Sequence, residues 1–215
     1  MSAAAASGRA DPHQLGHGEV PVSERGPAPK RIVVAYGFWI FLLSDFIMFA
    51  SFFAGYAVLV SATADGPAPR DLFDLKLVAW ETAALLLSSF ACGMAGVAMA
   101  VRNVRWFQIG MAATALLGTA FLAMELYEFV HLIGEGAGPS RSAFLSAFFA
   151  LVGCHGLHVL LGLLWLSTMM AQVWAKGFRD DIIRRTQCFM LFWHALDIIW
   201  VALFTVVYLM GAGGA

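Results

Sequence analysis

Acidic and histidine side chains inside long apolar stretches are the residues of this sequence best suited to chemistry. A carboxylate at the centre of a membrane helix costs about 2.5–3.5 kcal/mol, so each one needs a partner, a proton or a polar ligand. Several of these side chains stand three residues apart and therefore share a helix face. The pairs are His155 and His158, His194 and Asp197, and Glu125 and Glu128. They are either functional groups or interhelical hydrogen bonds that hold a bundle together.

The depth of each side chain, taken from a helical rise of about 1.5 Å per residue, sorts these groups into two sets. The first set is predicted to form a lipid-binding site or a buried polar layer in the middle and inner part of the membrane: Asp45, His155, His158, His194 and Asp197. We expect Asp45 and His155 to interact, because their depths are similar. The second set is predicted to form a polar cluster near the outer helix ends, where hydration is cheap: Glu81, Glu125, Glu128 and His131.

A haem or metal site is a weaker interpretation of the same residues. His158 and His194 are candidate axial ligands of a b-type haem, as in a haem-b membrane anchor of a dehydrogenase, but they would be the only cross-helix pair. A copper site needs three neutral histidines together, and only three deep ones exist. Cys92, Cys154 and Cys188 form no CxxC motif. We therefore predict no catalytic, metal-binding or cofactor-binding residue.

The composition identifies the elements that must position these groups. Of 215 residues, 60% are hydrophobic and 13% are charged, which excludes a soluble globular domain. The formal net charge of −1 gives no indication of nucleic-acid binding. Five stretches are long enough to cross a bilayer as helices, and none contains proline. These stretches predict an all-α polytopic membrane protein with helices at about 34–61, 77–101, 107–129, 143–173 and 189–210.

The sequence before the first apolar stretch, residues 1–31, is rich in Ala, Gly, Pro and charge and is expected to be a disordered cytoplasmic tail. Residues 32–215 then form the transmembrane domain. Most of the 13 Lys and Arg residues fall in the tail and in the second and fourth loops, which predicts a cytoplasmic N-terminus and a periplasmic C-terminus. A small proton-coupled transporter using Asp45 is a further alternative, although no inverted repeat or proline-broken helix supports it.

Four segments together resemble subunit III of the haem–copper respiratory oxidases. They are GFWIFLLSDFIMFASFFAGYAVLV, ETAALLLSSFACGMAGVAM, MELYEFVHL with GPSRSAFLSAFFALVGCHGLHVLLGLLW, and FWHALDIIWVALFTVVYLMG. They cover all five stretches. In its number of helices, five, and in the sequences of these segments, the chain most resembles the cytochrome o (bo-type) ubiquinol oxidase branch of this family.

The resemblance implies an accessory subunit of an inner-membrane complex that oxidises ubiquinol, reduces dioxygen to water and pumps protons. It implies that haem and copper belong to subunit I, that subunits I, II and IV are partners, and that phospholipid lies in a V-shaped cleft between two helix groups. Asp45 stands where many members have a carbodiimide-reactive glutamate, one methylene longer. His155 and His158 match the HGLHV motif, His194 and Asp197 match WHxxD, and Glu125 and Glu128 match ExxE. Glu81 stands where mitochondrial-type members have a neutral residue.

Overall fold

The computed structural model describes residues 30–64, 66, 72 and 74–213. Five long helices account for most of this part of the chain, which confirms the predicted all-α architecture. They are α1 (Lys30–Leu59), α3 (Leu75–Ala100), α4 (Val104–Gly134), α5 (Ala143–Lys176) and α6 (Asp180–Leu203). The chain continues from α6 into a π-helical segment, η2 (Phe204–Leu209), and a last turn, α7 (Met210–Gly213). Of the expected disordered tail, residues 1–29 lie outside the described residues, whereas Lys30 and Arg31 begin α1.

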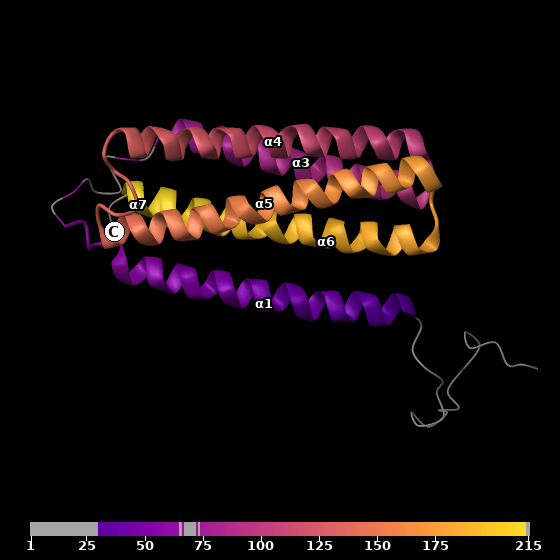
Figure 1. Ribbon diagram of the computed structural model, residues 1–215, viewed down its shortest axis with the longest axis horizontal. Coiled ribbons are helices and arrows are strands. Elements are labelled where there is room, and N and C mark those ends of the chain that lie inside the picture. Colours follow the sequence, from indigo (N-terminus) through magenta and orange to yellow (C-terminus); the bar gives the residue numbers. More distant parts are fainter. Residues whose placement is uncertain (1–29, 65, 67–71, 73, 214–215) are drawn as a thin grey trace, which may run out of the picture.

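The five helices lie side by side and alternate in direction, as short connections between neighbours require (Figure 1). Helices α3 and α4 form the closest pair, and α5 and α6 pack against them. Helix α1 lies along α5 and α6 at the edge of the bundle (Figure 1). The first described residue and the C-terminal turn are therefore at opposite ends. The V-shaped arrangement of two helix groups stays a prediction.

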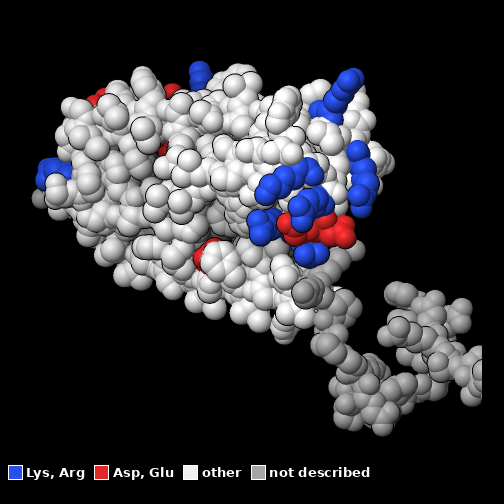
Figure 2. Space-filling view, turned by 45° about the vertical axis from the view of Figure 1, so that its right-hand side comes forward, with Lys and Arg blue, Asp and Glu red and all other residues white. Residues whose placement is uncertain are grey.

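All five helices are long and apolar enough to cross a membrane. Large apolar side chains cover the outside of the bundle, including Tyr36, Trp80, Leu116 and Ile198. Lys and Arg gather at one end of the molecule together with Asp and Glu, and a largely uncharged belt follows (Figure 2). We call this the basic end, and it carries Arg102, Arg105, Lys176, Arg179, Arg184 and Arg185. The opposite end, which holds Lys76, Arg141 and the C-terminal turn, is the far end.

Polar side chains fix where several helices begin. Asn103 accepts a hydrogen bond from the backbone N–H of Trp106 at the start of α4, and Ser142 does the same for Leu145 at the start of α5. Helix α6 begins at Asp180, well before the expected residue 189. Its first turn carries Asp180 and Asp181, whose negative charge is favourable at a helix N-terminus. The expected fourth loop is therefore short, and part of its charge lies on the helix.

The centre of the bundle is organised around Trp193 of α6, of which 1% is exposed. A Cβ atom placed on Gly118 of α4 would lie 2.8 Å from the indole Cη2, and one on Gly162 of α5 would lie 3.0 Å from Cζ3. The ring thus packs directly on the backbones of two other helices. Small residues at both positions are what allows this approach.

Candidate functional site

Helices α3 and α6 are joined by three hydrogen bonds between side chains. The indole Nε1 of Trp200 donates to Thr82 Oγ1 at 3.1 Å, and that of Trp193 donates to Ser88 Oγ, also at 3.1 Å. The residue after Ser88 makes the third contact, in which Ser89 Oγ lies 2.7 Å from His194 Nδ1. Because the two tryptophans stand seven residues apart, they present their N–H groups on one face of α6. Inside a membrane no water is available to these N–H and hydroxyl groups, so the bonds between the two helices satisfy them.

His155 of the expected polar layer is completely buried in an aromatic cage. Its Nε2 donates to the backbone carbonyl of Leu196 at 3.3 Å, and Nδ1 has no hydrogen-bond partner among the described residues. The rings of Phe121 and Trp200 lie 5.7 Å and 5.1 Å from the imidazole. Within the described residues no hydrogen bond or ion pair joins Asp45 to His155, so the expected interaction is not found there as a direct polar contact.

Asp45 instead interacts electrostatically with His158, one turn further along α5. Asp45 is half-buried on α1. The His158 ring lies 5.3 Å from the ring of Phe49 on α1, and its Nδ1 donates to the carbonyl of Cys154 at 2.7 Å. The two histidines of the i,i+3 pair therefore have different surroundings, since one faces the core and the other faces α1.

His194 and Asp197 lie on the other side of the bundle, against α3. His194 Nδ1 is 3.9 Å from Asp197 Oδ2, and Asp197 interacts electrostatically with Cys92 of α3. No hydrogen bond or ion pair within the described ranges joins these two residues to Asp45, His155 or His158. The expected layer is thus divided: Asp45 and His158 lie between α1 and α5, His155 bonds to α6, and His194 and Asp197 face α3. His158 and His194 therefore point to different neighbours rather than to a shared haem pocket.

The three glutamates of the second set are buried, contrary to the expected cheap hydration. Glu81, Glu125 and Glu128 are 0%, 2% and 5% exposed. The expectation is wrong because α4 extends to Gly134, so that Glu125 and Glu128 stand inside the helix and are covered by its neighbours. His131 alone is hydrated, with 58% of its side chain exposed and Nε2 3.5 Å from Glu135 Oε1.

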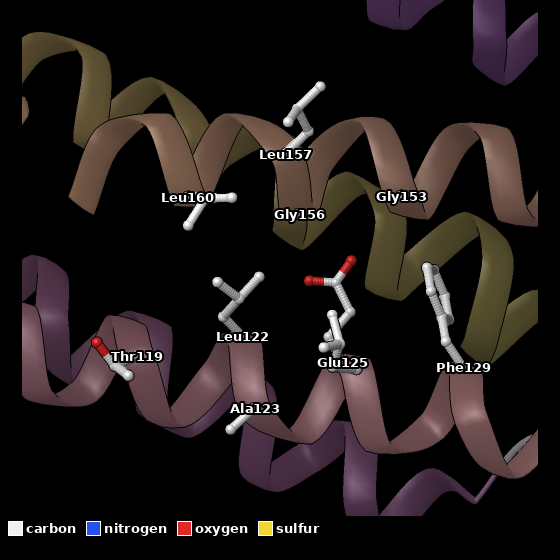
Figure 3. A pocket seen from close by; sticks show the side chains of 10 residues that line it. Thr119, Leu122, Ala123, Glu125, Phe129, Gly153, Gly156, Leu157 and Leu160 are labelled. Atoms are coloured by element: carbon white, nitrogen blue, oxygen red, sulfur yellow. The ribbon is translucent and has the colours of Figure 1, made fainter. Parts of the chain in front are cut away.

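The carboxyl of Glu125 points from α4 across to α5, where Gly156 faces it (Figure 3). A Cβ at position 156 would overlap the carboxyl group. The two residues border a groove of about 490 Å³ whose other walls are almost entirely apolar, among them Leu122, Phe129 and Leu160. A single carboxyl therefore lies buried beside an apolar groove between two membrane helices.

A second cavity, of about 360 Å³, lies at the basic end between α1, α5 and α6. Its apolar wall includes Phe38 and Trp165, whose ring centroids are 5.8 Å apart, and its polar wall includes Arg184 and Arg185. Neither arginine makes an ion pair within the described residues, because the nearby Asp181 pairs with Arg179 at 3.4 Å. The cavity thus combines two free guanidinium groups with an apolar surface.

Sequence reasoning missed the partners that hold the polar groups in place. Thr82, Ser88, Ser89 and Tyr208 are not ionisable at neutral pH, so a search for acidic and histidine side chains passes over them. The seven-residue spacing of Trp193 and Trp200, which places both on one helix face, is the signal that could have indicated the α3–α6 bonds. Among the described residues, no three His, Cys, Asp or Glu side chains come together to hold a metal ion.

The family model for cytochrome c oxidase subunit III matches residues 28–212. The chain is 50% identical to cytochrome bo(3) ubiquinol oxidase subunit 3 of Pseudomonas aeruginosa, over 94% of this chain and 95% of the relative. It is 42% identical to quinol oxidase subunit 3 of Bacillus subtilis, over 83% and 87%. It is 44% identical to cytochrome c oxidase subunit 3 of Alkalihalophilus pseudofirmus, again over 83% and 87%.

Proposed function

Because the chain belongs to the cytochrome c oxidase subunit III family, we propose that it is the non-catalytic accessory subunit of a haem–copper ubiquinol oxidase. The observation that carries the proposal is the extent of the match, which runs through all five helices and includes the HGLHV and WHALDIIW segments. The chain is accordingly part of an oxidoreductase complex. The haem-b anchor of a dehydrogenase is not favoured, because His158 and His194 face different helices.

We assign the redox chemistry of the complex to other subunits. The relatives of similar identity are named for ubiquinol, quinol and cytochrome c oxidases. Relatives 42–50% identical to this chain are thus named for oxidases with different electron donors, which agrees with a role outside the choice of donor. We propose ubiquinol as the donor from the bo(3) relative, haem and copper in subunit I, and subunits I, II and IV as the partners that this chain stabilises.

The chain is a multi-pass membrane protein, and we propose the bacterial inner membrane as its location. The excess of Lys and Arg at the basic end supports a cytoplasmic position for that end. The N-terminus of α1 is then cytoplasmic, and the C-terminal turn is periplasmic. The odd number of spans requires this opposite placement of the two ends.

The cavity at the basic end supports binding of an anionic phospholipid. Guanidinium groups form strong charge-assisted hydrogen bonds with phosphate oxygens. Arg184 and Arg185 place two guanidinium groups in the wall of this cavity. The apolar wall at Phe38 and Trp165 is suited to an acyl chain. We therefore propose that a phospholipid head group lies at the arginines with its chain along the α1–α5 interface.

Replacing both arginines by glutamine, R184Q/R185Q, is expected to lower the amount of anionic phospholipid retained by the purified oxidase about tenfold at this site, since 1.4 kcal/mol corresponds to a factor of ten. Native mass spectrometry and lipid extraction measure the retained lipid. The control is Arg105→Gln, which removes an exposed arginine of the basic end outside the cavity. Equal lipid content in the double variant and the control would contradict the site.

The accessory role is tested by purifying a tagged form of the chain from its own membranes under mild detergent. We expect the other oxidase subunits to co-purify in equal amounts, with haem and copper in the complex and ubiquinone in the lipid extract. Deletion of the chain is expected to leave the redox centres assembled but the complex less stable. Recovery with a flavin-containing dehydrogenase, or a b-type haem spectrum from the isolated chain, would overturn the assignment.

A further inference from the structure

Glu81 of α3 and Glu125 and Glu128 of α4 form a buried carboxyl cluster. Helices α3 and α4 are the closest pair in the fold, and Glu81 interacts electrostatically with both residues of α4. Glu125 and Glu128 also interact with each other across one helical turn. All three side chains are at least 95% buried within the chain. Three acidic groups therefore share one small region of low dielectric constant.

The cluster lacks the partners that usually accompany buried charge. Both carboxyl oxygens of Glu81 and Glu125, and Oε1 of Glu128, have no hydrogen-bond partner in the described ranges. The exception is Glu128 Oε2, which accepts a hydrogen bond of 2.9 Å from the hydroxyl of Tyr208 on η2. No Lys, Arg or His makes an ion pair with any of the three there. Within the described residues, then, no protein cation compensates the charge of these carboxyl groups, and burial of such a charge is costly.

The groups that face the cluster come from every element around it. Helix α3 contributes Glu81 itself, and α4 contributes the other two glutamates. Segment η2 contributes Tyr208, and α5 presents the backbone of Gly156 to Glu125 (Figure 3). The residue before α3, Asp74, adds a further negative charge that acts on Glu128. The surroundings thus disfavour three simultaneous carboxylates, and the cluster is suited to holding protons.

A cavity leads from this cluster to the far end of the bundle. Its volume is about 150 Å³, and its polar lining consists of Asp74, Tyr127, Glu128 and His131. His131 is exposed at the surface, so the cavity extends from the hydrated helix end to the buried carboxyl of Glu128. At roughly 30 Å³ for each molecule, this space accommodates about five waters. Glu128 is therefore the member of the cluster closest to water.

We propose that Glu81, Glu125 and Glu128 form an exchangeable proton site that is filled and emptied through the cavity at Glu128. A proton that leaves the cluster passes to a water molecule in this cavity and departs as hydronium, while one carboxylate remains behind. The hydrogen bond from Tyr208 stabilises that carboxylate, and the reverse transfer restores the neutral group. The site lies at the far end of the bundle, away from the arginine-lined cavity. Proton exchange at this site is a property additional to the accessory role proposed above.

Infrared spectroscopy of the whole oxidase in lipid nanodiscs tests the proposal, because protonated carboxyl groups absorb separately from carboxylates. Wild-type oxidase is expected to show a protonated-carboxyl band that shifts when H₂O is replaced by D₂O and changes in amplitude with pH. Glu81→Gln and Glu125→Gln should each remove part of it. Glu128→Gln should slow the D₂O shift of the remainder by about a hundredfold, the lower end of what a positioned proton-transfer group contributes.

Two further variants separate this site from a purely structural role. Tyr208→Phe removes the hydrogen bond to Glu128 and is expected to move the frequency of the pH-sensitive band without abolishing it. Glu135→Gln changes an exposed glutamate at the end of α4 and should leave the band and its exchange rate unchanged. The proposal is overturned if the three cluster variants assemble into the oxidase and retain the wild-type band. Exchange in Glu128→Gln at the wild-type rate would also overturn it.

Discussion

Replacing Trp193 by alanine is expected to lower the free energy of unfolding of this chain by about 3–5 kcal/mol, as for other buried tryptophans. The indole packs on the backbones of Gly118 and Gly162 and donates its N–H to Ser88, so the substitution opens a cavity among four helices and breaks a buried hydrogen bond. Reversible unfolding in mixed micelles measures the loss. Heating the assembled oxidase and quantifying the subunit that stays bound measures its consequence.

Trp174 provides the matched control for this substitution. It is a tryptophan near the basic end of α5 with 81% of its surface exposed, and its replacement by alanine should change the unfolding free energy by no more than about 0.5 kcal/mol. Trp193→Phe should fall between the two, because it keeps an aromatic ring but loses the donor to Ser88. Equal losses for Trp193→Ala and Trp174→Ala would refute the central role of Trp193.

Replacing Gly156 by alanine is expected to destabilise the chain by about 1–3 kcal/mol, the usual cost of overpacking. The new Cβ would overlap the Glu125 carboxyl, so that α4 and α5 must separate or the carboxyl must move. Unfolding of the single variants and of G156A/E125A forms a double-mutant cycle. Because Glu125→Ala removes the group that the new methyl meets, we expect a favourable coupling of about 0.5–3 kcal/mol in the double variant.

Gly93 on α3 supplies the control for backbone effects alone. A Cβ there meets nothing within 4 Å, so Gly93→Ala should be neutral or should stabilise the helix by up to about 1 kcal/mol through its higher helix propensity. Strictly additive effects of Gly156→Ala and Glu125→Ala would contradict direct packing of the carboxyl on the glycine.

The number and order of the helices were predictable because both depend on local composition. A run of about 20 apolar residues is a strong signal for a membrane span, and it does not require knowledge of its neighbours. The ends of the helices could not be predicted as well from apolar composition. An apolar run marks the part of a helix that lies in the hydrocarbon. The helix itself continues into water where caps and charges stabilise it, as Asp180 and Asp181 do at the start of α6.

The surroundings of the polar groups could not be read from depth along a helix. Depth places Asp45 near His155 and His158 equally well, and only the rotation of α1 against α5 brings it to His158. For the same reason, depth along the helix did not reveal that the glutamates are buried. A position near a helix end predicts hydration only when no neighbouring helix covers it. Glu81 and Glu128 are buried because side chains of neighbouring helices lie over them.

The edge position of α1 determines when this helix can join the bundle during synthesis. Its main contacts are with α5 and α6, and only 11% of its most apolar stretch is buried. The ribosome has to add some 80 residues after α1 before α5 begins, which takes roughly 4–16 s at bacterial rates. Helix α1 therefore enters the membrane before its packing partners α5 and α6 and docks only after they follow. During that interval Asp45 stands in the lipid bilayer before His158 has been synthesised.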